Sequence, residues 1–251
     1  MLRSSFSREG EKEFWADRSR PRLVGDYLNR PKVIACAGSL EGRRALDAGC
    51  GSGYVARELF RNGAQVWGID RDQEMICEAK RLMSAKNTSL VYQPGKIECL
   101  PYNDEFFDVA ICVSVLPYND VMVVDAFFEG IARVLKPGGR CVVSLAHPDM
   151  YHLAGSESAG EKSAWLRFSS HRISCEGTPM YTQEYFDIDG NSSVQEIYAH
   201  TEESLLISAH RTCLTHTASK AIEYPKVLTE QYPRWGSAWS YPAYLILEFE
   251  K

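Results

Sequence analysis

Long apolar runs are missing from this sequence. No stretch reaches the roughly 20 apolar residues that a membrane-spanning helix needs, and residues 1–10 are polar, without the apolar core of a signal peptide. We therefore expect a soluble, cytoplasmic protein with no membrane partner. An excess of basic residues is missing as well, since 28 Lys and Arg stand against 33 Asp and Glu. A nucleic-acid partner usually requires a basic face, so that class of function is disfavoured.

Paired cysteine spacing and internal repeats are also missing. The eight cysteines include no C-x-x-C pair, so we expect neither a structural zinc site nor any other metal site. Cys112 and Cys141 fall in apolar runs, which predicts buried free thiols rather than disulfides. The 251 residues, 45% of them apolar and 11% aromatic, suffice for one α/β domain with an added lid.

Apolar runs alternate with helical patterns along most of the chain. The predicted strands are 44–48, 65–69, 89–93, 107–113 and 140–145. Helical spacing follows the first strand over 54–62, and Asp72, Asp120 and Thr201 are placed to cap three further helices. Strands that alternate with helices of this length predict a parallel sheet with crossover helices. Ligands bind such sheets beyond the carboxyl ends of the strands.

A glycine-rich loop follows the first predicted strand. Residues 47–53 read Asp-Ala-Gly-Cys-Gly-Ser-Gly, and Asp70 ends the second strand. Glycines let the backbone approach a ligand closely, and a loop that opens a helix offers free N–H donors to an anionic group. An acid at the end of the second strand suits ribose hydroxyls. The pattern predicts a nucleoside-containing cofactor, although Asp70 as a plain surface acid is the alternative.

The spacing of the loop argues against a dinucleotide. The dinucleotide fingerprint G-x-G-x-x-G, started at Gly49, needs a glycine at position 54, where Tyr54 stands. The third glycine is Gly53 instead. A nicotinamide-dependent oxidoreductase is therefore disfavoured.

Three stretches together resemble one known family. The loop from Asp47 is similar to motif I of class I S-adenosylmethionine (SAM)-dependent methyltransferases. Residues 95–108, G-K-I-E-C-L-P-Y-N-D-E-F-F-D, and residues 131–139, I-A-R-V-L-K-P-G-G, resemble stretches of the ubiquinone/menaquinone-type small-molecule subgroup (Methyltransferase 11-like). The resemblance covers roughly residues 40–150.

The resemblance implies a doubly wound α/β fold. Its Rossmann-like sheet would have seven mostly parallel strands, the sixth and seventh formed by 215–224 and 244–251 as an antiparallel hairpin. We expect four regions. These are a helical N-terminal flap (1–40), the SAM-binding core (41–147), an inserted substrate lid (148–200) and a completion of the core sheet (201–251). Residues 9–36 are expected to be helical, with breaks near Pro21 and Pro31.

The same resemblance assigns the cofactor site. Asp47 would order the loop, Asp70 would bind the ribose hydroxyls with Arg71 beside it, and the Ile97 backbone would meet adenine. The backbone of Cys112 and Val113 would meet the methionine amino group. The loop residues against the methionine portion would be Gly49, Cys50, Gly51 and Gly53.

One position departs from the family pattern. The family places a carboxylate for the adenine amino group where this chain has Lys96, and an ammonium cannot accept a hydrogen bond. Glu98 is the nearest candidate to replace it, although a surface role for Glu98 is equally open.

Candidates for the acceptor side are weaker. His147, directly after the fifth strand, is a candidate general base or orienting residue, or else closes the turn before Pro148. His200, before the predicted helix at Thr201, resembles a pocket-facing family position. Aromatic side chains could line the acceptor pocket or simply pack, namely Trp15, Tyr181, Tyr185 and Phe186.

The predicted function is methyl transfer from SAM to an O or N atom of a small organic acceptor in specialised biosynthesis. Carbon methylation of a quinone-like or polyketide ring is an alternative, and a non-catalytic SAM-binding protein is another. The chain is expected to act as a monomer or a homodimer.

Overall fold

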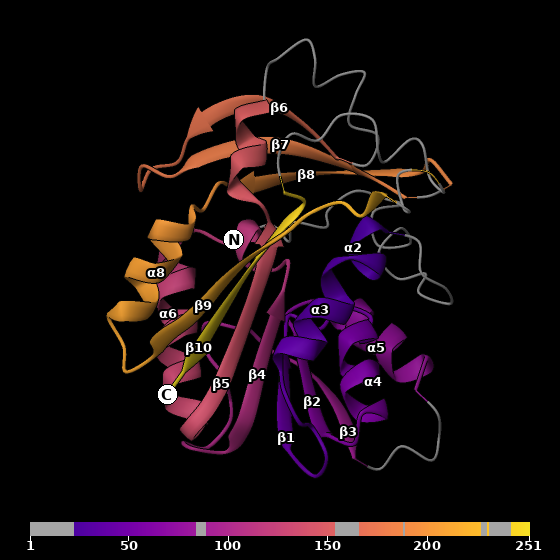
Figure 1. Ribbon diagram of the computed structural model, residues 1–251, viewed down its shortest axis with the longest axis vertical. Helices are drawn as coiled ribbons and strands as arrows, with labels where there is room; N and C mark the ends of the chain where they lie inside the picture. Colours follow the sequence, from indigo (N-terminus) through magenta and orange to yellow (C-terminus); the bar gives the residue numbers. More distant parts are fainter. Residues whose placement is uncertain (1–22, 84–88, 154–165, 188, 227–229, 231–241) are drawn as a thin grey trace.

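The computed structural model describes residues 23–83, 89–153, 166–187, 189–226, 230 and 242–251. A large twisted sheet forms the body of the molecule, and a smaller sheet lies across one of its ends (Figure 1). Within the described residues, no helix has the length and apolarity needed to cross a membrane.

The large sheet has seven strands in the order β3-β2-β1-β4-β5-β10-β9. Strands β1 to β5 pair in parallel, and β10 pairs antiparallel with both β5 and β9. The predicted fold class is confirmed. The strands are β1 Arg44–Ala48, β2 Gln65–Asp70, β3 Leu90–Pro94, β4 Phe107–Val113, β5 Leu135–Ala146, β9 Thr215–Ile222 and β10 Tyr244–Glu250.

Strand β5 begins five residues before the predicted start at 140. Leu135 already pairs with Phe107, ahead of the turn in which Gly138 takes φ +73°. The other predicted strands agree with the structure to within two residues at each end.

Helices cover both faces of the large sheet (Figure 1). The three predicted N-caps are confirmed, because the side chains of Asp72, Asp120 and Thr201 each accept a hydrogen bond from a backbone N–H of the first turn. The helices are α2 Val24–Tyr27, α3 Asn29–Cys36, α4 Tyr54–Arg61, α5 Gln73–Arg81, α6 Val121–Val134 and α8 Glu202–His210.

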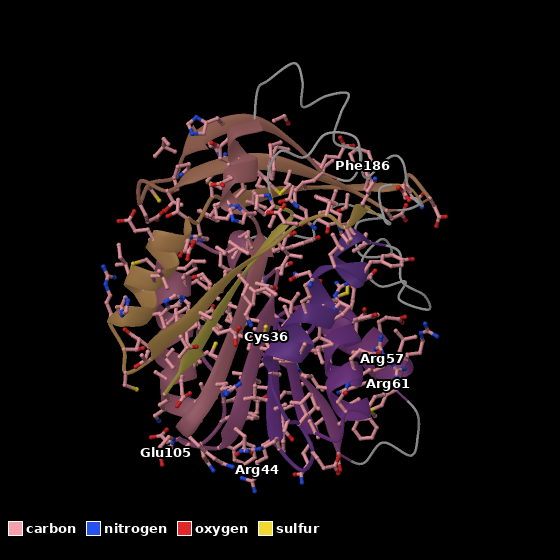
Figure 2. All side chains as sticks on the ribbon, in the orientation of Figure 1. Cys36, Arg44, Arg57, Arg61, Glu105 and Phe186 are labelled. Carbon is pink, nitrogen blue, oxygen red and sulfur yellow. The ribbon has the colours of Figure 1, made fainter. Side chains whose placement is uncertain are left out.

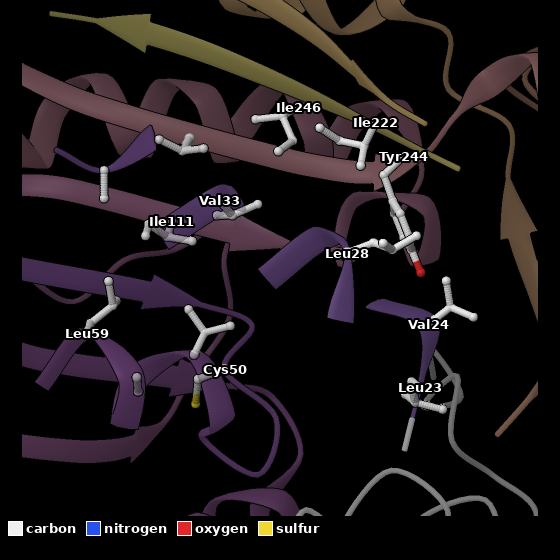
Figure 3. Close-up of a cluster of buried hydrophobic side chains, with 14 of the residues drawn as sticks. Leu23, Val24, Leu28, Val33, Cys50, Leu59, Ile111, Ile222, Tyr244 and Ile246 are labelled. Atoms are coloured by element: carbon white, nitrogen blue, oxygen red, sulfur yellow. The ribbon is translucent and has the colours of Figure 1, made fainter. Parts of the chain in front are cut away.

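Two apolar layers hold these helices on the sheet. One layer packs helices α2, α3, α4 and α5 on one face of the sheet, and the other packs α6 and α8 on the opposite face. Figure 3 shows part of the first layer, with Tyr244 of β10 extending toward Leu28 and Val24. The N-terminal helices therefore pack directly on the sheet beside the carboxyl ends of its strands.

The predicted break near Pro31 is present, but it lies three residues earlier than the proline. Helix α3 runs through Pro31, which occupies its first turn, where a missing N–H removes no helical hydrogen bond. The interruption falls at Leu28, between α2 and α3. Pro21 and Trp15 lie outside the described residues.

The inserted region forms a separate antiparallel sheet. Its strands are β6 Leu166–Ile173, β7 Pro179–Phe186 and β8 Ser192–Tyr198, in the order β6-β7-β8. We call it the insertion sheet. It lies over the carboxyl ends of β4 and β5 (Figure 1), and Phe186 at the end of β7 is far from Arg44 and Glu105 at the opposite end of the molecule (Figure 2). Short 3-10 helices, Leu116–Tyr118 and Pro148–Leu153, follow β4 and β5.

Candidate cofactor and acceptor site

A cavity lies between the carboxyl ends of the core strands and the insertion sheet. Its interior volume is about 160 Å³. The core contributes the glycine loop and the ends of β2 and β4, while Gln183 and Tyr185 come from β7.

The glycine loop is fixed to the end of β2. The N–H groups of Gly49 and Cys50 both donate to the Ile69 carbonyl, at 2.8 and 3.0 Å. Cys50 lines the cavity, and burial raises the pKa of its thiol well above the usual value. The thiol is therefore neutral near physiological pH.

The three loop glycines are required for different reasons. All have positive φ, at +76°, +52° and +77° for Gly49, Gly51 and Gly53. A Cβ on Gly49 would stand 2.4 Å from Val115, and one on Gly53 would stand 2.2 Å from the Tyr92 hydroxyl. A Cβ on Gly51 would meet nothing within 4 Å. Gly49 and Gly51 line the cavity, whereas Gly53 begins α4 against Tyr92 and does not line it.

Asp47 connects β1 to the helix after the loop. Its carboxylate accepts a hydrogen bond from the Ala56 N–H at 2.9 Å, although the side chain is buried. Burial raises the pKa of Asp47 to about 7, opposed by the bond from Ala56, and the Asp70 charge raises it further. This geometry agrees with a role in ordering the loop.

Asp70 stands at the end of β2 and faces the cavity. One carboxylate oxygen accepts from the Gly51 N–H at 2.8 Å, and the other accepts from the Asp72 N–H at 2.9 Å. Burial raises the pKa of Asp70, opposed by these two hydrogen bonds. Each oxygen has a further lone pair for a hydroxyl donor, as ribose recognition requires.

Glu98, two residues after Lys96, is the carboxylate closest in sequence to the departure from the family pattern. The Lys96 ammonium lies 3.5 Å from the Glu98 carboxylate and is largely exposed. Ile97 and Glu98 line the cavity, whereas Lys96 does not. Glu98 is therefore available on the side of the cavity where the resemblance places adenine.

Arg30 is a cavity residue that the sequence reasoning missed. It lies in the first turn of α3, forms an ion pair with the buried Asp26, and places its guanidinium 5.0 Å from the centre of the Tyr54 ring. Its signal in the sequence is the i, i+4 pair with Asp26, which also describes an ordinary surface pair. Arg71 also lines the cavity, as predicted beside Asp70.

The segment after β4 forms another wall. Val113 lines the cavity, whereas the Cys112 side chain is buried in the apolar layer under α6. Asn119 lines the cavity as well, and its side chain donates to the Val115 carbonyl at 2.8 Å. Ser114, with φ +56°, turns the chain between these residues.

The two candidate histidines do not line the cavity. His200 is buried behind its wall, with Nε2 2.8 Å from the Asn119 carbonyl oxygen, and burial lowers the pKa of its ring. A neutral ring in this place holds the Asn119 backbone. His147 accepts a hydrogen bond from the Asp149 N–H at Nδ1, 3.3 Å away, as expected for a histidine that closes a turn. A catalytic role for either stays a prediction.

The end of the cavity nearest the insertion sheet, which we call the acceptor end, is lined by tyrosine and amide side chains. Tyr118, Tyr185 and Tyr244 line it, and the hydroxyls of Tyr185 and Tyr244 are hydrogen-bonded at 2.6 Å. Tyr181 stacks on Tyr151 and does not line the cavity, nor does Phe186. Trp15 lies outside the described residues.

Comparison with known proteins connects this geometry to a family. Residues 46–143 match the family model described as a methyltransferase domain, and this span contains the glycine loop, β2, β3 and β4. Residues 46–143 are therefore similar to a methyltransferase domain, and the fold is one that SAM-dependent methyltransferases share. The resemblance stated from the sequence is confirmed, and SAM is the cofactor of this domain class.

Two curated relatives of the methyltransferase domain are O-methyltransferases by name. The ubiquinone biosynthesis O-methyltransferase of Alkalilimnicola ehrlichii is 35% identical over 113 residues, which are 45% of each protein. The malonyl-[acyl-carrier protein] O-methyltransferase of Erwinia billingiae is 34% identical over 131 residues, covering 52% of this chain and 48% of that protein. The chain thus spans about half the length of the curated relatives it matches.

Solved structures share the fold over a longer span. An S-adenosylmethionine dependent methyltransferase from Mesorhizobium loti superposes with a TM-score of 0.65 at 19% identity, covering 88% of this chain and 96% of that one. At this identity the likeness shows the fold alone.

Proposed function

We propose that this chain transfers the methyl group of SAM to an oxygen or nitrogen atom of a small organic acceptor. The supporting observation is a cavity that joins two unlike ends. The core end carries Asp70 and the glycine loop, and the other end is covered by β7 through Gln183 and Tyr185.

Each part of SAM has a candidate partner among the lining residues. Asp70 would bind the ribose hydroxyls, and the backbone of Gly49 and Gly51 would lie against the methionine portion. Arg30 would pair with the methionine carboxylate, because a guanidinium binds a carboxylate through two parallel hydrogen bonds. Glu98 would accept from the adenine amino group.

SAM supplies a methyl group already activated by its sulfonium sulfur. A lone pair on the acceptor forms the new bond to the methyl carbon, the S–C electron pair stays on the sulfur of S-adenosylhomocysteine, and any acceptor proton leaves to solvent. The protein then has to align the two molecules and exclude water. Alignment falls to the Asp70 and Arg30 contacts on one side and to the tyrosine walls on the other.

Oxygen methylation is the preferred reading, because both curated relatives described above are O-methyltransferases by name. Those two proteins are named for different acceptors, so their names do not identify the acceptor of this chain.

Calorimetry with SAM and with NAD, followed by an acceptor screen, tests the proposal. We expect SAM to bind and NAD not to bind. Mass spectrometry after incubation with phenols, amines and carboxylic acids should find a product heavier by one methylene group, and fragmentation locates it on O, N or C. Absence of SAM binding overturns the proposal, while SAM binding with no transfer to any acceptor class supports the non-catalytic alternative.

A further inference from the structure

The insertion sheet presents two glutamines toward the cavity side. Gln183 of β7 and Gln195 of β8 are directly opposite each other in the antiparallel register. Opposite residues share one face of a sheet, with Cβ atoms roughly 4.5–5.5 Å apart. Gln183 lines the cavity, so this face is the one that covers it, and Gln195 lies on the same face without itself lining the cavity.

Gln195 is buried without a hydrogen-bond partner. Only 5% of the residue is exposed, and neither its amide nitrogen nor its amide oxygen has a partner. Buried polar groups in folded proteins are nearly always satisfied, so an unpaired amide calls for an explanation. A ligand group that reaches the β7–β8 face would supply the missing partners.

Gln183 is already oriented by its surroundings. It is buried, and its hydrogen bond with the Tyr118 hydroxyl opposes the rise in the pKa of Tyr118 that burial causes. An amide has two N–H donors and two acceptor lone pairs, so one bond to Tyr118 leaves Gln183 with donors and an acceptor to offer.

Gln183, Tyr118 and Tyr185 are uncharged, whereas the Arg30 charge acts on the Tyr244 hydroxyl. The charged residues of the cavity wall all come from the core and from α3, namely Arg30, Asp47, Asp70, Arg71 and Glu98. A carboxylate or ammonium on the acceptor would therefore lose its water beside the uncharged Gln183, Tyr118 and Tyr185. The rings of Tyr118, Tyr185 and Tyr244 offer aromatic surfaces instead.

We propose that Gln183 and Gln195 together recognise an uncharged, planar acceptor through a lactam-type edge, in which an N–H donor adjoins a carbonyl acceptor. Two neighbouring amides match such an edge because each can donate to the carbonyl and accept from the N–H. The tyrosine rings hold the plane of the acceptor. This proposal rests on the proposed function, since it names the acceptor class for the same cavity.

Binding of three matched probes tests the proposal. Quinolin-2(1H)-one carries the edge, 2-naphthol has a similar shape without the N–H, and 2-naphthoate carries a charge. Their dissociation constants are measured by ligand-observed NMR on the protein saturated with S-adenosylhomocysteine. We expect quinolin-2(1H)-one to bind roughly tenfold more tightly than either naphthalene, as one or two hydrogen bonds allow.

Variants then assign the preference to the two amides. Gln183→Leu should remove the preference for quinolin-2(1H)-one and leave 2-naphthol within about twofold, and Gln195→Leu should reduce the preference in the same direction. The matched control is Gln65→Leu, at an exposed position at the start of β2, and it should keep the full preference.

Three outcomes would overturn the proposal. One is tighter binding of 2-naphthoate than of quinolin-2(1H)-one, and another is equal binding of the three probes. The last is a preference for quinolin-2(1H)-one that remains in both Gln183→Leu and Gln195→Leu. SAM affinity, measured by calorimetry for every variant, reports on folding and on the cofactor end. Loss of SAM binding in the unmodified protein would defeat the proposed function itself, whereas intact SAM binding without discrimination defeats only this proposal.

Discussion

At its core end, the cavity is lined by the backbone of the glycine loop and by the buried carboxylates Asp47 and Asp70. At the insertion-sheet end, it is lined by neutral side chains. Asp47 and Asp70 lie where three glycines bend the chain, whereas Gln183, Tyr118 and Tyr185 are carried by two elements distant in sequence. The core end suits one charged cofactor with a fixed shape. The insertion-sheet end can change its side chains without disturbing the loop below it.

The largest expected effect tests whether the buried Asp47 carboxylate makes the stability of the protein depend on pH. The native pKa of Asp47, about 7, lies above its ordinary value of 3.8. Its contribution to stability is therefore fully present below about pH 4 and lost as pH rises through about 7. Asp47→Asn should remove this dependence, because the amide oxygen still accepts from Ala56 without titrating.

Urea unfolding of the unmodified protein and of Asp47→Asn from pH 4 to pH 8 measures the difference. The stability of the unmodified protein relative to the variant should fall with rising pH by at most about 4 kcal/mol. A difference that is flat with pH, or that grows in favour of the unmodified protein, would contradict the raised pKa.

The second test separates the glycine needed for folding from the one next to the ligand. Gly53→Ala should cost about 3 kcal/mol of stability, since a positive φ and a clash with Tyr92 act together. Gly42→Ala is the matched control, with φ +70° and no atom within 4 Å of the added Cβ, and it should cost about 1 kcal/mol.

Gly51→Ala completes this series. Its added Cβ meets no protein atom, so stability should fall by only about 1 kcal/mol while SAM affinity falls, because the methyl group projects toward the cofactor. Thermal unfolding and calorimetry on the three variants give both quantities. Equal SAM affinity in Gly51→Ala and Gly42→Ala would show that Gly51 does not approach the cofactor.

The third test concerns Asp70. Asp70→Ala should weaken SAM binding by roughly 30- to 100-fold, which corresponds to the loss of one or two hydrogen bonds to a charged group. Asp104→Ala is the control, since that carboxylate is exposed and pairs with Arg133. Calorimetry that finds the two variants alike would remove Asp70 from the ribose site.

The smallest expected effect concerns the hydrogen bond between Tyr185 of β7 and Tyr244 of β10. Tyr185→Phe and Tyr244→Phe each remove the hydroxyl pair that joins β7 to β10, and each should cost about 1 kcal/mol. In the double variant the cost should be less than the sum, with a coupling of about 1 kcal/mol from unfolding measurements. Additive costs would mean that the hydroxyl pair does not connect the two sheets energetically.

Sequence reasoning reached the core end because its signals are local. The helix caps at Asp72, Asp120 and Thr201 lie within three residues of the backbone they bind, and the glycine loop and Asp70 directly follow two predicted strands. Motifs of this kind can be read without knowing the fold. The break expected near Pro31 lies at Leu28 instead of at the proline, because a proline in the first turn of a helix leaves that helix intact.

The insertion-sheet end was less accessible to the same reasoning. The pairing of Gln183 with Gln195 depends on antiparallel register, and register depends on loops and neighbouring strands rather than on a motif. Arg30 was missed because its place beside the cavity follows from how α3 packs on the sheet. Tyr181, Tyr185 and Phe186 were candidates from the sequence, but only Tyr185 among the three lines the cavity.

The position of β10 near the end of the sequence has a consequence for how the protein folds during translation. This strand lies between β5 and β9 and carries Tyr244, which follows every other described cavity residue in chain order. During translation, β5 therefore presents an open edge until β10 emerges, and such edges favour association between chains. A nascent chain halted before residue 244 would contain the complete glycine loop and still lack one wall of its cavity.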